Sequence, residues 1–239
     1  MFSCSLQNDI LYLFLAQVII FMKFNSLKWL LILIFFSNIG YAHDIDNKPV
    51  AKHGVEFQKV SNKVLVCSAC HGKAGVSPNT SWPNIAGQNV RYLTKQLNDF
   101  KLGKDRFEPT MSAIIANLTP KDFDDLANYY ASQKIIYTNP NPDLFVQGAR
   151  IYTQGDFKKH ITACIACHGP HGEGNGSAGF PAIAGQMPLY TVNQLKAFKD
   201  KRRTNDINHI MRDISSHMSN EDMQAIANYI KALAQPAKN

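Results

Sequence analysis

The sequence predicts an all-α protein made of two tandem domains, and three observations lead to that prediction. The 239-residue chain contains an internal repeat whose two copies match in order and in spacing. Each copy has stretches of helical periodicity and clear helix-start signals, and neither has the alternating pattern that is typical of strands. Each copy also carries one Cys-x-x-Cys-His motif. One repeat is therefore expected to be one folding unit of about 100 residues.

The repeat sets the predicted domain boundaries. One copy reads Cys-Ser-Ala-Cys-His-Gly from Cys67 and Pro-Asn-Ile-Ala-Gly-Gln from Pro83. The other reads Cys-Ile-Ala-Cys-His-Gly from Cys164 and Pro-Ala-Ile-Ala-Gly-Gln from Pro181. Between them, Thr-Asn-Pro-Asn-Pro at 138–142 disfavours a helix, because proline lacks a backbone N–H and restricts the residue before it. The predicted domains are residues 43–138 and 139–239.

Local signals place several helices in order. The first is expected around residues 55–68 and leads into the first Cys motif, and the next spans about 89–102. A further helix begins at Thr119, whose hydroxyl can cap it, with proline at the first helical position. Ser219 repeats that start in the second copy, ahead of an apolar helix at 223–233.

Residues 1–42 have the layout of an export signal. Their two apolar stretches are each shorter than the roughly 20 residues that cross a bilayer as a helix. From Met22 the order is that of a secretory signal peptide, namely lysines, an apolar segment, and small residues ending at Ala42. We predict cleavage after Ala42, a mature start at His43 and a periplasmic location, with residues 1–21 as an upstream extension. The alternative is an uncleaved apolar anchor.

The most specific chemical signal is the doubled Cys-x-x-Cys-His motif. Of the 5 cysteines in the chain, every one except Cys4 belongs to such a motif. In a c-type haem site the two thiols form thioether bonds to the haem, and the histidine binds the iron. Disulfides are the default in an exported protein, a thioredoxin-like motif would follow a strand, and a zinc site would need ligands beyond His171. We therefore predict two covalently attached haem c groups, on Cys67, Cys70, Cys164 and Cys167, with His71 and His168 as axial iron ligands.

A six-coordinate electron-transfer haem needs a second axial ligand, commonly a methionine or a histidine. Met111 and Met211 occupy matching places in the two copies, each ahead of a capped helix. A lone methionine is more often core filler, but Met111 has no other methionine near it between the two Cys motifs. In the second copy His209, His217 and Met218 compete, and Met218 aligns with a leucine. We predict Met111 and Met211 as the distal iron ligands.

Other repeated residues have expected supporting roles. The carbonyls of Pro83 and Pro181 can accept a hydrogen bond from the ligating histidines, which would fix each ring and raise its basicity. The alternative is that both are turn prolines. Gly87 and Gly185 are expected to let the backbone pass close to the porphyrin edge.

The chain resembles the cytochrome c4 family, dihaem periplasmic electron carriers built from two class I cytochrome c domains. The resemblance covers essentially all of the chain after the export signal. It rests on the two doubled motifs, on Gln-Leu-x-x-Phe at 96–100 and 194–198, and on the stretch 203–214. It implies two tandem cytochrome c-like domains, each wrapped around one haem c with His/Met-ligated iron. At Lys201 the first copy has Gly103 and the family commonly has glycine, which leaves a local loop change open.

The predicted function is electron transfer without substrate chemistry, because two protein ligands leave the iron no open site. The resemblance implies transfer toward a terminal oxidase of a respiratory chain, with an upstream quinol-oxidising complex as another redox partner and loose membrane association. Two alternatives remain: the cytochrome subunit of a flavin-containing sulfide dehydrogenase-like enzyme, and a dihaem peroxidase, which needs a displaceable haem ligand. No small-molecule substrate is expected. The net charge of +7 gives little support to nucleic-acid binding, since haem propionates offset much of it.

Basic residues gather at matching helix ends in the two copies. They are Lys95, Lys101, Lys104 and Arg106, and Lys196, Lys199, Lys201, Arg202 and Arg203. One interpretation is a pair of solvated helix C-termini, where cations are favoured. The other is a ring of cations that steers an acidic redox partner, in which case the charge mainly raises the association rate.

Overall fold

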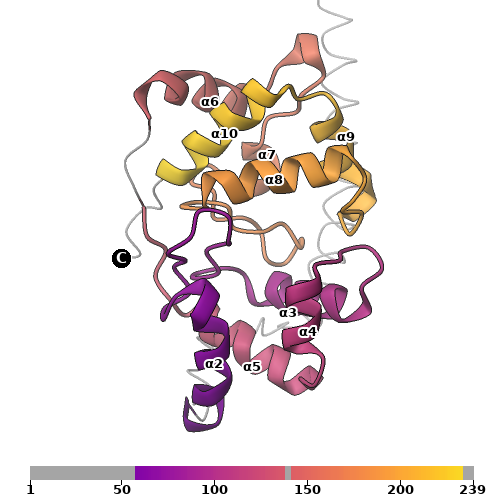
Figure 1. Ribbon diagram of the computed structural model, residues 1–239. Helices are drawn as coiled ribbons and strands as arrows, with labels where there is room; N and C mark the ends of the chain where they lie inside the picture. The colour runs from indigo at the N-terminus through magenta and orange to yellow at the C-terminus, as the bar shows by residue number, and fades with distance from the viewer. Residues whose placement is uncertain (1–56, 138–140, 234–239) are drawn as a thin grey trace, which may run out of the picture. The chain divides into compact units, whose positions relative to one another are not determined.

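The computed structural model of the protein describes residues 57–137 and 141–233 (Figure 1). Within these residues the regular structure is helical, with three isolated β-bridges and no strand, so the all-α prediction is confirmed. The predicted signal peptide and its cleavage site lie outside the described residues. Among the residues that are described, no helix is both long and apolar enough to cross a membrane.

The first half contains four described α-helices. They are α2 (Phe57–His71), α3 (Val90–Leu102), α4 (Pro109–Ile115) and α5 (Pro120–Ala131). Helix α3 packs on α4 and α5, and α2 packs on α5. The buried core of this half consists of Val64, Leu93, Leu126, Ala127 and Tyr130. These packing partners leave the C-terminal end of α2, with the first Cys motif, against the core.

The second half has a longer series of elements. They are α6 (Pro142–Gln154), η1 (Phe157–Lys159), α7 (Ile165–His168), α8 (Pro188–Lys199), η2 (Ile207–His209), α9 (Ile210–Ser216) and α10 (Asn220–Ala232). Helix α10 packs on α6 and α8, and α8 packs on α9. Helices α6 and α10 approach closely at Gly148, where an added Cβ would lie 2.2 Å from the carbonyl oxygen of Ala225. Glycine is thus required at that crossing.

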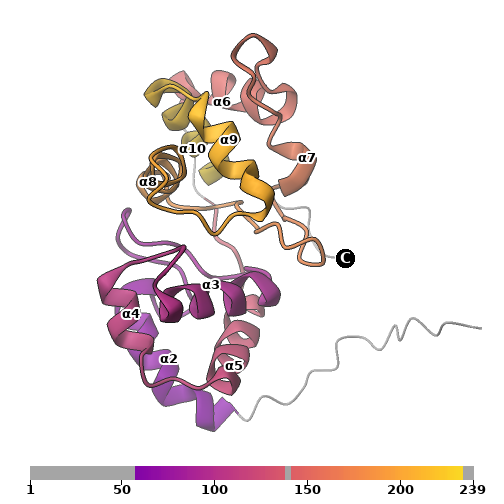
Figure 2. The same cartoon turned by 90° about the vertical axis from the view of Figure 1, so that its right-hand side faces the viewer.

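The principal helix contacts of the described residues fall within one half or the other, as Figures 1 and 2 show. Hydrogen bonds nevertheless join the two halves, and the described residues of both belong to one compact unit. The boundary at 138 and 139 therefore stays a prediction from the repeat.

Two helix starts are as the sequence predicts. Thr119 caps α5 and Ser219 caps α10, each in a reciprocal capping box with Asp122 or Asp222. The predicted end of the first helix at residue 68 is wrong, because α2 continues through the Cys motif to His71.

The loop at Lys201 keeps the conformation of its counterpart. Gly103 has φ +66° and Lys201 has φ +57°, so both lie in the left-handed region. That region costs a residue with a Cβ roughly 1–2 kcal/mol. The lysine therefore adopts the strained backbone of the glycine, and the local loop change does not occur.

Candidate haem-binding site

The two Cys motifs sit on helical turns of different length. Cys67, Cys70 and His71 form the last turn of α2, whereas Cys164 precedes the four-residue α7, which ends at His168. In both places the i, i+3 spacing puts the two sulfurs on one helix face. All four thiols are free, which argues against the disulfide alternative. Each helix turn thus presents a pair of thiols and a histidine together.

The histidine of each motif is held by the backbone of the following loop. The Nδ1 atom of His71 lies 2.9 Å from the carbonyl oxygen of Pro83, and the same distance joins His168 Nδ1 to Pro181. Donation from Nδ1–H leaves the lone pair on Nε2, as an iron ligand requires. Burial lowers the pKa of both histidines, against the opposing effect of the proline carbonyls. Both rings are therefore set as neutral imidazoles of one tautomer.

Met111 lies in the first turn of α4, and its backbone N–H donates to the side chain of Glu108, the residue that caps this helix, at 2.7 Å. Met211 lies in the matching turn of α9. The N–H of the next residue, Arg212, donates to Asp206 at 3.0 Å. An acidic side chain therefore anchors the start of both short helices.

The three competitors of Met211 differ from it in burial or in position. Met218 also lines the cavity, but it is 2% exposed and belongs to the core of the second half. His209 and His217 are exposed and do not line the cavity described below, and the His217 ring packs against that of His160. Met211 is half-buried and lines the cavity.

One cavity of about 1300 Å³ runs through the described unit and is lined by both halves. Its lining includes every predicted site residue, namely Cys67, Cys70, His71, Pro83, Met111, Cys164, Cys167, His168, Pro181 and Met211. Its volume exceeds the roughly 300–1,000 Å³ of an ordinary ligand pocket. Burial raises the pKa of the Cys67 thiol, and that of Cys164 to about 12.

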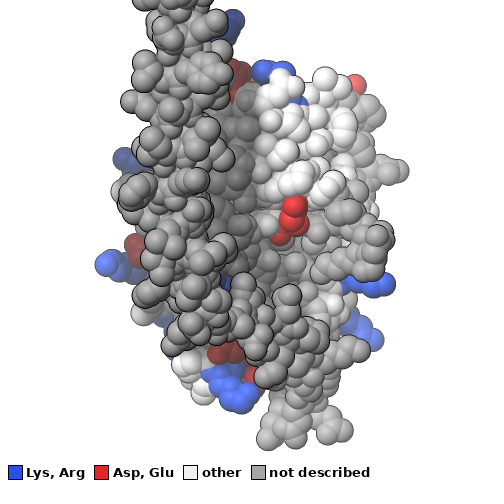
Figure 3. Space-filling view, turned by 180° about the vertical axis from the view of Figure 1, so that it is seen from behind, with Lys and Arg blue, Asp and Glu red and all other residues white. Residues whose placement is uncertain are grey.

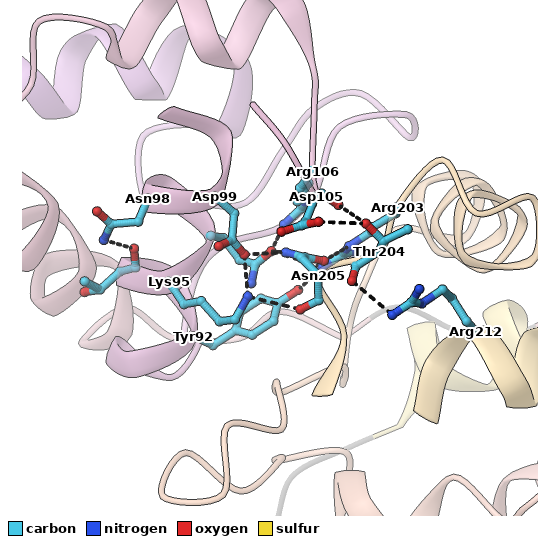
Figure 4. A network of polar contacts seen from close by, with 12 residues as sticks. Tyr92, Lys95, Asn98, Asp99, Asp105, Arg106, Arg203, Thr204, Asn205 and Arg212 are labelled. Carbon is cyan, nitrogen blue, oxygen red and sulfur yellow. Dashed lines mark hydrogen bonds and ion pairs between the residues drawn. The ribbon is translucent and has the colours of Figure 1, made fainter. Parts of the chain in front are cut away.

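A network of hydrogen bonds crosses between the halves beside this cavity (Figure 4). Arg106 and Arg203 face each other across an antiparallel bridge. Arg106 donates to the Tyr190 hydroxyl of the second half at 2.9 Å, and Arg203 donates to the Tyr92 hydroxyl of the first half at 2.9 Å. Both guanidinium groups also donate to Gln96. Each arginine thus contacts the tyrosine of the opposite half, and Tyr92 and Tyr190 occupy equivalent positions in the repeat.

These two arginines carry buried positive charge. Each guanidinium also stacks on a phenylalanine of its own half, Arg106 on Phe100 at 4.2 Å and Arg203 on Phe198 at 4.5 Å. Within the described residues neither arginine forms an ion pair with a carboxylate. Burial lowers the pKa of Arg106, and the adjacent Arg203 acts in the same direction. A bound group that brings carboxylates would relieve this charge.

A second set of crossed contacts involves the glutamines that end the Pro-x-Ile-Ala-Gly-Gln motifs. Gln88 donates to the carbonyl of Ala182 at 2.7 Å and accepts from its N–H at 2.9 Å. Gln186 makes the same two bonds to Asn84, both at 2.8 Å. We call these paired contacts the glutamine clasps. Asn84 and Ala182 directly follow Pro83 and Pro181, whose carbonyls contact the histidines. Each clasp therefore holds the backbone next to one of these prolines.

The repeated glycines have close neighbours in the chain itself. An added Cβ on Gly87 would lie 2.5 Å from the side chain of Ile135, and one on Gly185 would lie 2.6 Å from the carbonyl oxygen of Ile136. Both glycines therefore make room for the chain segment that follows α5, and their expected place beside a porphyrin edge stays a prediction.

The residues of the cavity fit haem c. Two pairs of free thiols, two neutral histidines and two methionines line it. The two buried guanidinium groups without carboxylate partners match a cofactor that carries propionates. No group of three or more His, Cys, Asp or Glu side chains in the described part of the chain is arranged to hold a metal ion alone. Two helical halves with these features define a dihaem c-type cytochrome.

Comparison with known proteins identifies the family. The family described as Cytochrome c matches residues 145–234. Cytochrome c4 from Pseudomonas aeruginosa is 42% identical over 172 residues, covering 72% of this chain and 85% of the relative. The crystal structure of reduced recombinant cytochrome c4 from Pseudomonas stutzeri is similar with a TM-score of 0.72 and 39% identity, covering 74% of this chain and 98% of that one. The chain belongs to the cytochrome c4 family and is an electron-transfer protein with two covalently attached haem c groups.

A further relative has a more specific name. The thiosulfate dehydrogenase electron acceptor of Stutzerimonas stutzeri is 34% identical over 181 residues, covering 72% of this chain and 80% of the relative. Relatives named cytochrome c4 are electron carriers rather than enzymes, as the sequence led us to expect.

Two members of the basic clusters are not surface cations. Arg106 and Arg203 are buried between the halves, and Lys95 donates to Asp99 and Asn205 in the same network. The steering interpretation stays a prediction for the exposed members, which are Lys101, Lys104, Lys199, Lys201 and Arg202. On the part of the surface that Figure 3 colours, Lys and Arg lie in several separate places. No sequence signal distinguishes these two arginines from the other cations of the clusters, most of which are likewise followed by a residue that is not a cation.

Proposed function

We propose that this chain carries electrons in the periplasm, with one haem on Cys67 and Cys70 and the other on Cys164 and Cys167. The observation that carries the proposal is the repeated contact of a neutral histidine with a proline carbonyl, at 2.9 Å in both halves. An oriented histidine beside two free thiols is the arrangement that a covalently attached haem needs.

The bound haem would supply an iron that exchanges one electron between Fe(III) and Fe(II). His71 and His168 would bind the irons through Nε2, and Met111 and Met211 would bind on the opposite side. Pro83 and Pro181 hold the histidine rings through their carbonyls. If these two histidines and two methionines hold the irons, a peroxidase reaction would find no free position on the iron, which favours transfer over catalysis.

The axial ligands can be tested by substitution. In the oxidised protein an Fe–S(Met) bond gives a weak charge-transfer band toward the red end of the spectrum. Met111→Ala and Met211→Ala should each remove this band from one haem and lower its reduction potential. Met187→Ala, at a methionine that does not line the cavity, is the matched control and should leave the band intact. Retention of the full band in Met211→Ala, with its loss in His209→Ala, would contradict the assignment.

We further propose a terminal oxidase as the electron acceptor and a quinol-oxidising complex as the donor. A second candidate donor is a thiosulfate dehydrogenase, because a relative at 34% identity is named as the electron acceptor of that enzyme. Stopped-flow mixing of the reduced protein with an isolated oxidase, and of the oxidised protein with thiosulfate dehydrogenase and thiosulfate, separates these partners. Rapid reduction in the second experiment, with slow oxidation in the first, would favour the thiosulfate route.

Export is proposed from the sequence of residues 1–42. The secreted protein should begin at His43 and carry the mass of two haem groups. Intact-mass measurement on the periplasmic fraction decides the point. A membrane-bound form that retains the N-terminal apolar segment would favour the anchored alternative.

A further inference from the structure

The side chain of Tyr130 ends in a buried hydroxyl without a partner. Tyr130 is 3% exposed and belongs to the core of the first half. Among the described residues its Oη atom has no hydrogen-bond partner. Buried hydroxyl groups are almost always hydrogen-bonded, so this one calls for an acceptor.

The ring of Tyr130 has little freedom to turn away. It packs edge-on against the Tyr129 ring, with centroids 5.0 Å apart and an interplanar angle of 83°. Gly75, at φ +80°, lies so close that an added Cβ would be 2.8 Å from the Tyr130 ring carbon Cδ1. The position of the hydroxyl is therefore set by packing.

The hydroxyl faces the first cysteine of the first Cys motif. Tyr130 and Cys67 both line the cavity, and Cys67 packs against the core cluster that contains Tyr130. Burial raises the pKa of the Cys67 thiol, and the Tyr130 hydroxyl partly opposes that rise by its contact with the sulfur. The sulfur of Cys67 is thus within the electrostatic reach of the hydroxyl.

Among the described residues, the second half has no tyrosine hydroxyl that is buried without a partner. At the place that matches Tyr130, after Asn228 and Tyr229, the chain has Ile230. The tyrosine near Cys164 is Tyr152 of α6, and its hydroxyl donates to the carbonyl of Gly169 at 2.6 Å. A backbone acceptor therefore already satisfies that tyrosine hydroxyl. The other buried hydroxyl without a partner among the described residues, that of Ser215 in α9, does not line the cavity.

We propose that the Tyr130 hydroxyl donates a hydrogen bond to the thioether sulfur of Cys67 and raises the reduction potential of the first haem relative to the second. The proposal rests on haem attachment at Cys67. Oxidation adds one positive charge to the haem, and the positive end of the O–H dipole points toward it. In a buried site this dipole destabilises the oxidised form more than the reduced form. Tyr130 is a positioning residue for the electron-transfer reaction, since it acts through the sulfur.

The test is an anaerobic redox titration of the dihaem protein and of Tyr130→Phe, which keeps the ring and removes the hydroxyl. Because sulfur is a weak acceptor, the reduction equilibrium of one haem should fall by roughly three- to tenfold in the variant. Tenfold corresponds to about 59 mV for a one-electron couple. The reduction equilibrium constant of the other haem should change by less than about twofold, because distant sites are nearly independent. Tyr129→Phe, whose hydroxyl donates to the Lys73 carbonyl at 3.3 Å, is the matched control and should leave both potentials in place.

Several outcomes would overturn the proposal. Unchanged potentials in a less stable Tyr130→Phe variant would show that the residue only packs, and equal shifts of both haems would show a general effect. Resonance Raman spectra of the unmodified protein give a second measurement, because a hydrogen bond to sulfur makes the haem-linked C–S stretching band shift between H2O and D2O. Absence of such a shift overturns the proposal without any variant. A mass with only one haem would instead overturn the attachment at Cys67, and with it the proposal.

Discussion

The two halves contain the same Cys-x-x-Cys-His motif in different structural surroundings. In the first half one continuous helix, α2, runs directly into Cys67, Cys70 and His71. In the second half α6 ends at Gln154, and a loop with a 3-10 turn precedes the short α7. The cavity lining also differs, with Tyr130 in the first half where the second has Ile230. Duplicated ligand sets therefore do not imply equal haem environments, because burial and hydrogen bonds around a haem tune its potential.

The largest expected effect comes from removing one pair of thiols. Cys67→Ala with Cys70→Ala should leave one covalent haem per chain, and Cys164→Ala with Cys167→Ala should leave the other, because thioether bonds alone survive denaturation. Intact mass and the haem absorbance after acid-acetone extraction measure this. The two double variants are each other's controls. Loss of both haems from either variant would show that the halves cannot load separately.

The glutamine clasps offer a sharper comparison. Gln88 is buried and Gln186 is half-buried, although each makes the same two backbone contacts. Gln88→Ala leaves the backbone groups of Ala182 buried without partners and should cost about 3 kcal/mol of unfolding free energy, against about 1 kcal/mol for Gln186→Ala. Urea unfolding of the haem-loaded protein measures both.

Gln133→Ala is the matched control for the clasps, because its amide bonds only to Tyr129 and Ser132 of the same half. Gln133→Ala should lower the unfolding free energy by less than either clasp variant does. Equal costs for all three would contradict the idea that burial sets the difference.

Acid should weaken both halves through a matched pair of aspartates. Lys63 holds the pKa of Asp122 at about 2. Burial alone would raise the pKa of Asp222, but bonds from Lys159 and the Ser219 backbone lower it. A folded-state pKa below the unfolded value of about 3.9 gives stability that is present above pH 4 and lost as the pH falls toward the folded value.

Substitution separates the contributions of the two aspartates. The side chain of Asp222 is 1% exposed, whereas Lys63 beside Asp122 is 38% exposed. Asp222→Asn should therefore cost about 2 kcal/mol at pH 7 and Asp122→Asn about 1 kcal/mol or less, and both differences should shrink as the pH falls below about 4. Unfolding free energies from pH 7 to pH 2 provide the check, and a cost that stays constant over that range would point to lost packing instead of lost charge.

The smallest expected effect concerns the left-handed loop. Lys201→Gly removes the Cβ strain but adds freedom to the unfolded chain, so we expect a gain of about 0.5–1 kcal/mol. Gly103→Ala makes the opposite change in the other half and should lower stability by a similar amount. Thermal unfolding of the two variants beside the wild type is sufficient. A destabilised Lys201→Gly would show that the lysine side chain stabilises the loop.

Sequence patterns predicted what depends on local chemistry. The all-α fold class, the starts of α5 at Thr119 and α10 at Ser219, and the family follow from capping residues and short motifs. The sites of α4 and α9 were not predicted as helices, because seven residues contain too few turns to show periodicity. The predicted end of α2 was wrong for a related reason. The residues of the Cys motif were interpreted by their chemistry, and their helical conformation was not recognised.

Contacts between the halves could not be predicted in this way. Arg106 and Arg203 follow helix ends and have the composition of solvated cations, yet both are buried because each finds a tyrosine in the opposite half. Gly87 and Gly185 have the positive φ that a close approach suggests, and one close neighbour of both is the 133–136 segment. A repeat shows that two units are alike, and it does not show which surfaces they turn toward each other.

The glutamine clasps also bear on how such a chain can arise. Gln88 contacts Ala182 while Gln186 contacts Asn84, and Asn84 and Ala182 are equivalent positions. This exchange of equivalent partners is the rule of an isologous two-fold interface, in which one patch is complementary to itself. A lone ancestral unit with one such glutamine would pair with its own copy through both clasps at once. Gene duplication and fusion would then preserve an existing dimer interface and add only a linker.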